Sequence, residues 1–521
     1  MRIRSSIVAW VALAGLTWAV RLDAQGHRMV IVLVIDGLRP DVIRPDIMPN
    51  LSRLKQEGVW FENAHSVFPT VTRVNSASIS TGTGPAEHGI VSNTMLVEAV
   101  SPKPFDTANY LNLVKLAEGS GGRTLPVRTM AESLESAGIR FVAISSGSTG
   151  GAFLMNPQAP SGTGVLINGS LVEGSRVAFP DQVNQEIMQK FGWKKSDVGI
   201  PSVLWTERVL RDYVIPTLRR GVIVDWMTEP DGSQHQFGVG SPQSLAALKT
   251  TDEQIGLLLA KLRQFGLERT TDVVVTADHG FGAEPETVDL NGALQATGHA
   301  SDIIVASNGA SVLLYAKNHS ADVIRAAATQ LEKTEGVDLL FTTATAPANG
   351  TVQCRPAQDL GWVPGTFSLE LIHECNPSRG ADIIGTFQWS SEKNPFGFSG
   401  MQKIATTSAQ RGVPGRSGHG GLNPFMVHTP MLFWGPDFRR QATSSAPVAN
   451  YDLAPTLLQL EGVAVPDTMR GRVINEAFAK GGKEPESRAR SVTARAGSYC
   501  AAIQLTQVGD RTYVDFGQRC P

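Results

Sequence analysis

The hydrophobic and polar positions of the chain predict a series of strands that are buried on both faces. Continuous apolar runs, rather than alternating ones, lie within residues 29–36, 140–145, 221–227 and 271–278. A strand with one solvated face would instead alternate apolar and polar residues. We therefore predict a parallel sheet that is covered by helices on both sides.

Segments with helical periodicity lie between these runs. The clearest is 241–265, in which apolar residues recur on one face at positions 245, 248, 255, 258, 259 and 262. We expect further helices at 46–58, 123–138, 203–219, 321–333 and 451–461, and shorter strands at 59–61, 311–316 and 430–434, the last strand of the sheet. The alternation predicts an α/β fold with a doubly wound, mostly parallel sheet flanked by helices. Such sheets bind ligands beyond the carboxyl ends of their strands.

Two regions do not fit this alternation. Residues 153–196 are rich in Gly, Pro and Asn, and we interpret them as an insertion of small strands and loops. Residues 345–400 are loop-rich and contain two cysteines. Because they lie between two segments with candidate ligands, we expect them to form a cap insertion over the site.

The first 24 residues have the features of a secretory signal peptide. Residues 1–4 supply a basic end, residues 7–20 are apolar apart from Gly15 and Thr17, and Ala24 is a small residue suited to cleavage. The apolar run is too short for a typical transmembrane helix, although an uncleaved anchor stays an open alternative. We expect an exported chain, periplasmic or secreted, with no transmembrane span beyond this segment.

Composition excludes some classes of partner. The 521 residues are 42% hydrophobic and 18% charged, which is typical of a globular protein with a large core. The formal net charge of -2 argues against binding to nucleic acid or to an anionic membrane. We therefore expect no nucleic-acid-binding domain, and any binding of phosphate must rely on local positive charge.

The four cysteines form two close pairs in the C-terminal third of the chain. In an exported protein the economical interpretation is two local disulfides, Cys354–Cys375 and Cys500–Cys520, although the sequence permits three pairings. None has the spacing of a zinc ribbon, so the sequence does not indicate a cysteine metal site.

Acidic residues and histidines follow three of the apolar strands. The residues concerned are Asp36, Asp231 with His235 four residues on, and Asp278 with His279, and a further histidine, His419, lies between glycines. Singly, each has another explanation, because Asp often caps a helix and a lone His is often a polar residue with satisfied hydrogen bonds. Together, they bring oxygen and nitrogen ligands to one edge of one sheet. Such ligands without thiolates suit Zn²⁺ or a similar divalent ion.

A hydroxyl-rich segment, residues 68–81, contains a candidate nucleophile. It combines a short loop with the start of a helix, and Thr72 lies near the join. The free N–H groups and the dipole of a first helical turn favour an anion such as phosphate. The alternative is that Thr72 only caps the helix.

These residues together resemble the nucleotide pyrophosphatase/phosphodiesterase (type I phosphodiesterase) family of the alkaline phosphatase superfamily. Six segments match the family's motifs in the same order: 35–37, 68–72, 88–93, 229–231 with His235, 277–280 and 418–420. The resemblance implies an alkaline phosphatase-like catalytic domain at 25–480, with the cap at 345–400, between the signal peptide 1–24 and a disulfide-closed tail at 481–521. We expect this tail to be a hairpin.

The resemblance also implies a two-zinc site and a phosphoric ester hydrolase. One ion would be held by Asp36, Thr72, Asp278 and His279, and the other by Asp231, His235 and His419. Asn93 would donate a hydrogen bond to a phosphoryl oxygen. The substrate would be a small-molecule phosphate ester or pyrophosphate, and hydrolysis would pass through a phosphothreonine at Thr72.

One departure from the family pattern leaves the substrate open. Thr72 is followed by Arg73, Val74 and Asn75 rather than by the family's usual aromatic, Pro and Asn-His. Arg73 can pair with a phosphate oxygen and favour a more highly charged monoester, or it can be a residue that only faces solvent or supports its neighbours. A phosphomonoesterase or phosphonate hydrolase on this scaffold is therefore the alternative, followed by a catalytically inactive binding protein. We assign His88, His299, His373 and His428 to structure.

Overall fold

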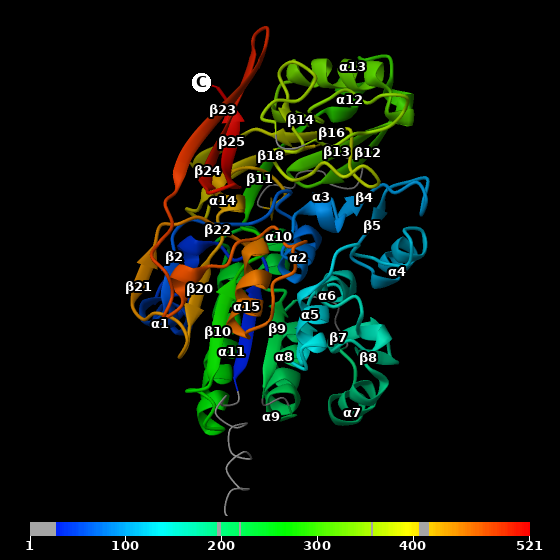
Figure 1. Cartoon of the computed structure of the whole chain (residues 1–521). Coiled ribbons are helices and arrows are strands. Elements are labelled where there is room, and N and C mark those ends of the chain that lie inside the picture. The colour runs from blue at the N-terminus through cyan, green and yellow to red at the C-terminus, as the bar shows by residue number, and fades with distance from the viewer. Residues whose placement is uncertain (1–27, 195–198, 218–219, 356–357, 406–415, 521) are drawn as a thin grey trace, which may run out of the picture.

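The central element of the fold is a nine-stranded sheet (Figure 1). The computed structural model describes residues 28–194, 199–217, 220–355, 358–405 and 416–520, so the expected signal peptide lies outside the described residues. In spatial order the strands are β21 (Ala442–Ser444), β2 (Val59–Phe61), β20 (Met431–Trp434), β10 (Thr271–Thr276), β1 (Met29–Ile35), β9 (Gly221–Met227), β6 (Phe141–Ser145), β7 (Val165–Val172) and β8 (Arg176–Phe179). The five strands from β10 to β7 run parallel, whereas β20 and β8 are antiparallel to their neighbours. The predicted mostly parallel sheet is confirmed.

Helices cover both faces of this sheet, as the double-sided burial of its strands requires. Along β1, Val30, Val32 and Val34 belong to one hydrophobic core, and Ile31 and Leu33 to the other. The first core includes residues of α2 (Thr72–Thr81), α4 (Tyr110–Glu118), α5 (Met130–Ser136), α6 (Thr149–Met155) and α15 (Leu453–Leu460). The second includes residues of α1 (Pro49–Glu57), α7 (Asp181–Phe191), α8 (Ile200–Val209), α9 (Ile215–Thr217) and α11 (Pro242–Gln264).

Two expectations about this layer are wrong, and a third is right only in part. Residues 153–196 are not an insertion, because they supply the end of α6, the sheet strands β7 and β8, and helix α7. The segment 430–434 is not the last strand, because β20 lies inside the sheet and β21 follows it in the chain. The expected helix at 123–138 shortens to α5, which begins only after Thr129, where the Thr129 and Glu132 side chains form a capping box.

Two smaller sheets lie above the main sheet in the view of Figure 1. One contains, in spatial order, β17 (Trp389–Lys393), β18 (Ser399–Ala405), β11 (Gly282–Val288) and β19 (Ser417–Gly418). The other contains β12 (Ile303–Asn308), β13 (Ser311–Ala316), β16 (Ile383–Phe387), β14 (Val337–Thr342) and β15 (Phe367–Ser368), with α12 (Leu290–Gln295) and α13 (Ala321–Glu332) packed against it. The loop-rich stretch 345–400 therefore supplies strands to both sheets.

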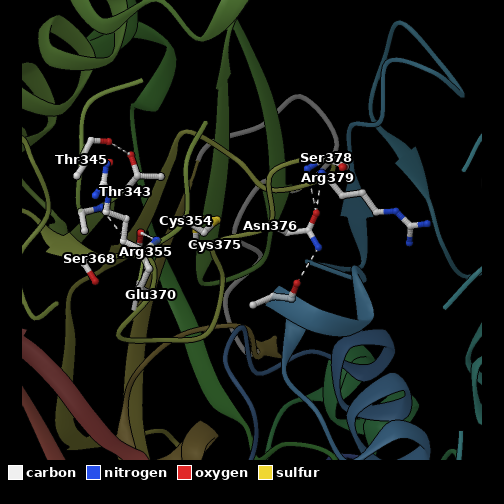
Figure 2. The surroundings of a disulfide bond; sticks show 12 residues. Thr343, Thr345, Cys354, Arg355, Ser368, Glu370, Cys375, Asn376, Ser378 and Arg379 are labelled. Carbon is white, nitrogen blue, oxygen red and sulfur yellow. Dashed lines mark hydrogen bonds between the residues drawn. A yellow bond between two sulfur atoms is a disulfide. The ribbon is translucent and has the colours of Figure 1, made fainter. Parts of the chain in front are cut away.

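A disulfide between Cys354 and Cys375 lies within this stretch, and Figure 2 shows its surroundings. Glu370 accepts hydrogen bonds from the backbone N–H groups of Arg355 and Ala344 on one side of it. On the other side, Asn376 Nδ2 donates to the carbonyl oxygen of Ala86 in α3 (Pro85–His88) at 2.9 Å. The loop closed by this disulfide is thus hydrogen-bonded to helix α3.

The C-terminal segment forms a third small sheet instead of the expected hairpin. Its strands are β23 (Arg488–Ala496), β24 (Tyr499–Val508) and β25 (Arg511–Arg519), and Cys500 pairs with Cys520. Both predicted disulfide pairings are therefore confirmed. The hydroxyl of Tyr499 donates to the carbonyl of Asp338 in β14, so this sheet packs against the five-stranded one. Within the described residues, no helix combines the length and the apolarity needed to cross a membrane.

Candidate metal centre and nucleophile

The predicted ligands meet at the carboxyl ends of β10, β1 and β9, the three central strands. Asp36 directly follows β1, and Asp278 and His279 follow β10. Asp231 is the first residue of α10 (Asp231–Phe237), the short helix after β9, and His235 lies on the same helix. His419 directly follows β19. The parallel register of the strands thus places residues that are far apart in the sequence at one edge.

One group of ligands surrounds His279. Its Nε2 lies 3.0 Å from Oδ2 of Asp278, 3.5 Å from Oδ1 of Asp36 and 3.3 Å from Oγ1 of Thr72. The other ring nitrogen, Nδ1, lies 3.1 Å from the carbonyl oxygen of Gly280. A carbonyl oxygen only accepts hydrogen bonds, so this contact assigns a proton to Nδ1, and Nε2 faces the carboxylates. This is the arrangement of a metal-ligating histidine.

A second group surrounds Asp231. Its Oδ1 lies 3.4 Å from Nε2 of His235 and 3.7 Å from Nε2 of His419. The Nδ1 atoms of these histidines face backbone carbonyl oxygens, those of Ser417 at 3.1 Å and Thr70 at 2.8 Å. Their Nε2 atoms therefore face Asp231 in the same way. The two groups adjoin, because the His279 and His419 rings stack at 3.6 Å and ligand atoms of Asp36, Asp231 and His279 lie within 4.8 Å of one another.

The carboxylates of the two groups require positive charge. Buried oxygens Oδ1 of Asp36, Oδ1 of Asp231 and Oδ2 of Asp278 receive no hydrogen bond from any described residue. By contrast, Oδ2 of Asp36 accepts from Trp226 Nε1 at 2.9 Å, and Oδ1 of Asp278 accepts from the Gly37 N–H at 3.0 Å. Burial, together with the nearby Asp278 and Asp231 carboxylates, raises the pKa of Asp36 well above its ordinary value. Divalent cations would pair with the three unpartnered oxygens, so the donor set fits metal ions.

Thr72 lies beside these ligands at the start of α2. Val71, rather than Thr72, is the N-cap residue, and Thr72 is the first helical residue. Its buried hydroxyl faces Nε2 of His279. The geometry therefore disfavours the alternative in which Thr72 acts only as a helix cap.

Asn93 and Arg73 lie next to Thr72. Oδ1 of Asn93 accepts a hydrogen bond from the backbone N–H of Arg73 at 3.0 Å, which orients the Asn93 amide and leaves Nδ2 as its donor. The Arg73 side chain is mostly buried, and Nη2 lies 3.7 Å from Oδ1 of Asp106. Nε of Arg73 is buried and donates to none of the described residues. The Arg73 guanidinium, on the residue that directly follows Thr72, thus has unused hydrogen-bonding capacity.

Two asparagines that the sequence did not single out support the site. Oδ1 of Asn75 accepts from the Val67 N–H at 2.8 Å, and Nδ2 donates to the Val67 carbonyl at 3.0 Å. Nδ2 of Asn450 donates to Oδ1 of Asn75 at 2.9 Å and to the Ala277 carbonyl at 3.0 Å. The pair thus connects the loop that presents Thr72 with the loop that presents Asp278. Apart from the position of Asn75 in the hydroxyl-rich segment, nothing in the sequence indicates this role.

We expect Asn75→Ala to lower the free energy of unfolding by about 1–3 kcal/mol, because the buried Val67 N–H loses its acceptor. The matched control is Asn112→Ala, whose amide donates to the Asp106 carbonyl in an exposed position. That control should change stability by less than about 0.5 kcal/mol. Denaturant unfolding of both variants measures the difference, and equal midpoints would argue against this role for Asn75.

The chain resembles members of one known protein family. The family described as type I phosphodiesterase / nucleotide pyrophosphatase matches residues 30–338, which is more than half of the chain. Human bis(5'-adenosyl)-triphosphatase ENPP4 is 26% identical over 276 residues, covering 51% of each chain. The venom phosphodiesterase CdcPDE of Crotalus durissus collilineatus is 26% identical over 261 residues, covering 48% of this chain and 26% of the relative. The matched region thus spans about half the length of these relatives or less.

A solved structure supports the fold. Murine ectonucleotide pyrophosphatase / phosphodiesterase 5 superposes with a TM-score of 0.57 over 84% of this chain and 96% of its own, at 17% sequence identity. At that identity the likeness concerns the fold, which is alkaline phosphatase-like. The match to the family over residues 30–338 contains Asp36, Thr72, Asp231, Asp278 and His279. The chain therefore belongs to the type I phosphodiesterase/nucleotide pyrophosphatase family of the alkaline phosphatase superfamily.

Proposed function

We propose that the chain is an exported, metal-dependent phosphoric ester hydrolase that cleaves phosphodiester or pyrophosphate bonds through a phosphothreonine at Thr72. The observation that carries this proposal is the position of the Thr72 hydroxyl, 3.3 Å from Nε2 of His279 and beside unpartnered buried carboxylate oxygens. Family membership supports the same activity. The relatives named above are a triphosphatase and a phosphodiesterase.

The residues would hold two divalent ions, which we propose are Zn²⁺. Asp36, Thr72, Asp278 and His279 would bind one, and Asp231, His235 and His419 the other. When bound, such ions lower the pKa of an adjacent hydroxyl and stabilise the charge on the attacking and leaving oxygens of an in-line displacement.

The chain's own groups account for the remaining steps. Oγ1 of Thr72 loses its proton to solvent and forms a bond to phosphorus while the bond from phosphorus to the leaving oxygen breaks. The leaving group takes up a proton from solvent and departs as the first product, and a diester leaves a phosphothreonine that still carries its second ester group. Water then attacks this phosphorus, the Thr72 oxygen leaves, and the second product is released. The positive end of α2, of which Thr72 is the first residue, favours the charge that develops on the phosphoryl oxygens. Nδ2 of Asn93 would donate a hydrogen bond to one of them, since Oδ1 already accepts from the Arg73 N–H.

The direct test of this function compares a chromogenic diester, bis(p-nitrophenyl) phosphate, with the monoester p-nitrophenyl phosphate on the zinc-loaded enzyme. A higher kcat/KM on the diester supports the proposal. A higher value on the monoester would favour the phosphomonoesterase alternative. A pure, folded protein with neither bound metal nor turnover would support the inactive binding protein.

The unused hydrogen-bonding capacity of Arg73 is the observation that favours the monoester alternative. We expect Arg73→Gln to lower kcat/KM for the monoester about tenfold more than for the diester, because a charge-assisted hydrogen bond contributes about 1.5–3 kcal/mol and the monoester carries more charge. Arg128→Gln is the control, since Arg128 bonds Ser136 on an exposed surface. Parallel losses on both substrates would show that Arg73 does not select between them.

Export and domain organisation are proposed on other observations. The two disulfides support an oxidising compartment, periplasmic or extracellular. We propose that 345–400 acts as a cap and that 25–480 is the catalytic domain. The tail 481–521 would then be an accessory sheet, and the substrate a small-molecule ester or nucleotide.

A further inference from the structure

A second cluster of metal-ligand side chains lies outside the proposed catalytic site. His65 belongs to β3 (Ala64–His65), which pairs in parallel with β22 (Val448–Ala449). His428 follows α14 (Pro424–Val427), and Asp515 lies in β25 of the C-terminal sheet. One ligand atom from each of the three residues lies within 4.8 Å of the other two. None of the three belongs to the two catalytic ligand groups.

The contacts of His65 require a positive charge at this cluster. Nδ1 of His65 lies 3.0 Å from the carbonyl oxygen of Val448, and Nε2 lies 2.9 Å from Oδ1 of Asp515. A carbonyl and an ionised carboxylate only accept hydrogen bonds, and a neutral imidazole has one N–H. The pair therefore requires either a second proton shared by Nε2 and Oδ1 or a metal cation bound by both atoms. The His65 side chain is only 2% exposed, so bulk solvent does not resolve the conflict.

The remaining contacts favour the metal. Oδ2 of Asp515 accepts a hydrogen bond from Oγ1 of Thr506 at 2.8 Å, and Nδ1 of His65 faces the Val448 carbonyl. Each side chain is thus oriented by the atom that would not bind the metal. His428 packs against His65 with ring centroids 5.0 Å apart. Its Nδ1 is buried and finds no hydrogen-bond partner among the described residues, which a salt bridge between His65 and Asp515 would not explain.

We propose that His65, His428 and Asp515 bind a divalent transition-metal ion, with Zn²⁺ as the preferred occupant. Two imidazoles and a carboxylate are typical zinc ligands, and three protein ligands leave a fourth position for water.

The location gives this ion a structural role. The next residue, Ser66, donates from Oγ to the carbonyl of Asp278 at 2.5 Å, and Val67 begins the loop held by Asn75. An ion shared by His65 and Asp515 would therefore fasten the C-terminal sheet to the chain that presents Thr72 and Asp278. This inference does not depend on the proposed catalytic reaction.

Zinc stoichiometry of the full-length chain tests the proposal. The protein is stripped with a chelator, reloaded with Zn²⁺, desalted and analysed for zinc per chain by mass spectrometry. We expect His428→Gln and Asp515→Asn each to bind one equivalent less than wild type, and the double variant to lose no more than one. The control is His319→Gln, because His319 pairs with Asp382 at 2.8 Å without a third ligand among the described residues and should keep the full zinc content.

Unchanged zinc content in folded His428→Gln and Asp515→Asn variants would overturn the proposal and identify a protonated His65 paired with Asp515. Circular dichroism and gel filtration establish folding. If both variants fail to fold, crystals of the zinc-loaded wild type decide, through anomalous scattering at the zinc edge. A peak between the three side chains supports the site, and its absence refutes it.

Discussion

Thr72→Ala is expected to lower kcat/KM by at least about a thousandfold while the protein retains its bound metal. Removal of a nucleophile that forms a covalent intermediate costs this much or more, which corresponds to about 4 kcal/mol of transition-state stabilisation. Metal binding should persist because Asp36, Asp278 and His279 still supply three ligands to the ion that Thr72 would also bind. Turnover of a chromogenic diester and zinc per chain, measured on the same preparation, check the prediction.

Thr72→Ser is the matched variant, because it keeps a hydroxyl at the first position of α2. It should retain a substantial part of the turnover. Incubation with substrate followed by acid quenching should leave covalent phosphate on the wild type and on the serine variant, but none on the alanine variant. Undiminished turnover in Thr72→Ala would remove Thr72 from the reaction. Loss of zinc together with turnover would mean that the residue acts only as a ligand.

The second large effect is expected for Asp231→Asn. Oδ1 of Asp231 lies between Nε2 of His235 and Nε2 of His419 and receives no hydrogen bond from the described residues. The substitution removes the negative charge of that group with little change in size. We expect a loss of at least about a hundredfold in kcat/KM, since changes to the outer partners of metal ligands alone cost about 10–100-fold.

The loss of activity should be accompanied by weaker zinc binding at one of the two proposed catalytic positions. Competition with a chromogenic chelator measures this affinity. Asp46→Asn is the control, because Asp46 forms an exposed ion pair with Arg44 and should leave both quantities unchanged. Full activity and normal zinc affinity in Asp231→Asn would contradict the assignment of this group as a metal site.

Sequence patterns predicted the central strands because burial on both faces leaves a local signal. The expected strand 221–227 coincides with β9, and the run from Met29 ends at Ile35 as β1 does. The acidic residues that follow these strands could also be placed together, because parallel register aligns the carboxyl ends of the strands. Thr72 needed the family resemblance, because a threonine at a helix start is common without catalysis.

Other features left no such local signal. Strand β7 contains Asn168 and Gly169, which are uncommon in strands, so its composition suggested a loop. It lies next to β8, the edge strand of the sheet. Strand β23 is mostly exposed and contains three arginines, which concealed the third strand of the C-terminal sheet. Asn450 acts through contacts with residues more than 170 positions away, which no local pattern reveals. His428, which the sequence left among structural histidines, gains a proposed role only from its position beside His65 and Asp515.

The proposed function requires that seven side chains, including that of Thr72, hold two cations. A crystal structure of the zinc-loaded protein, with anomalous difference maps measured on both sides of the zinc edge, tests this most directly. We expect one zinc peak among Asp36, Thr72, Asp278 and His279 and a second among Asp231, His235 and His419. Maps in which either position lacks a zinc peak would contradict the proposed function.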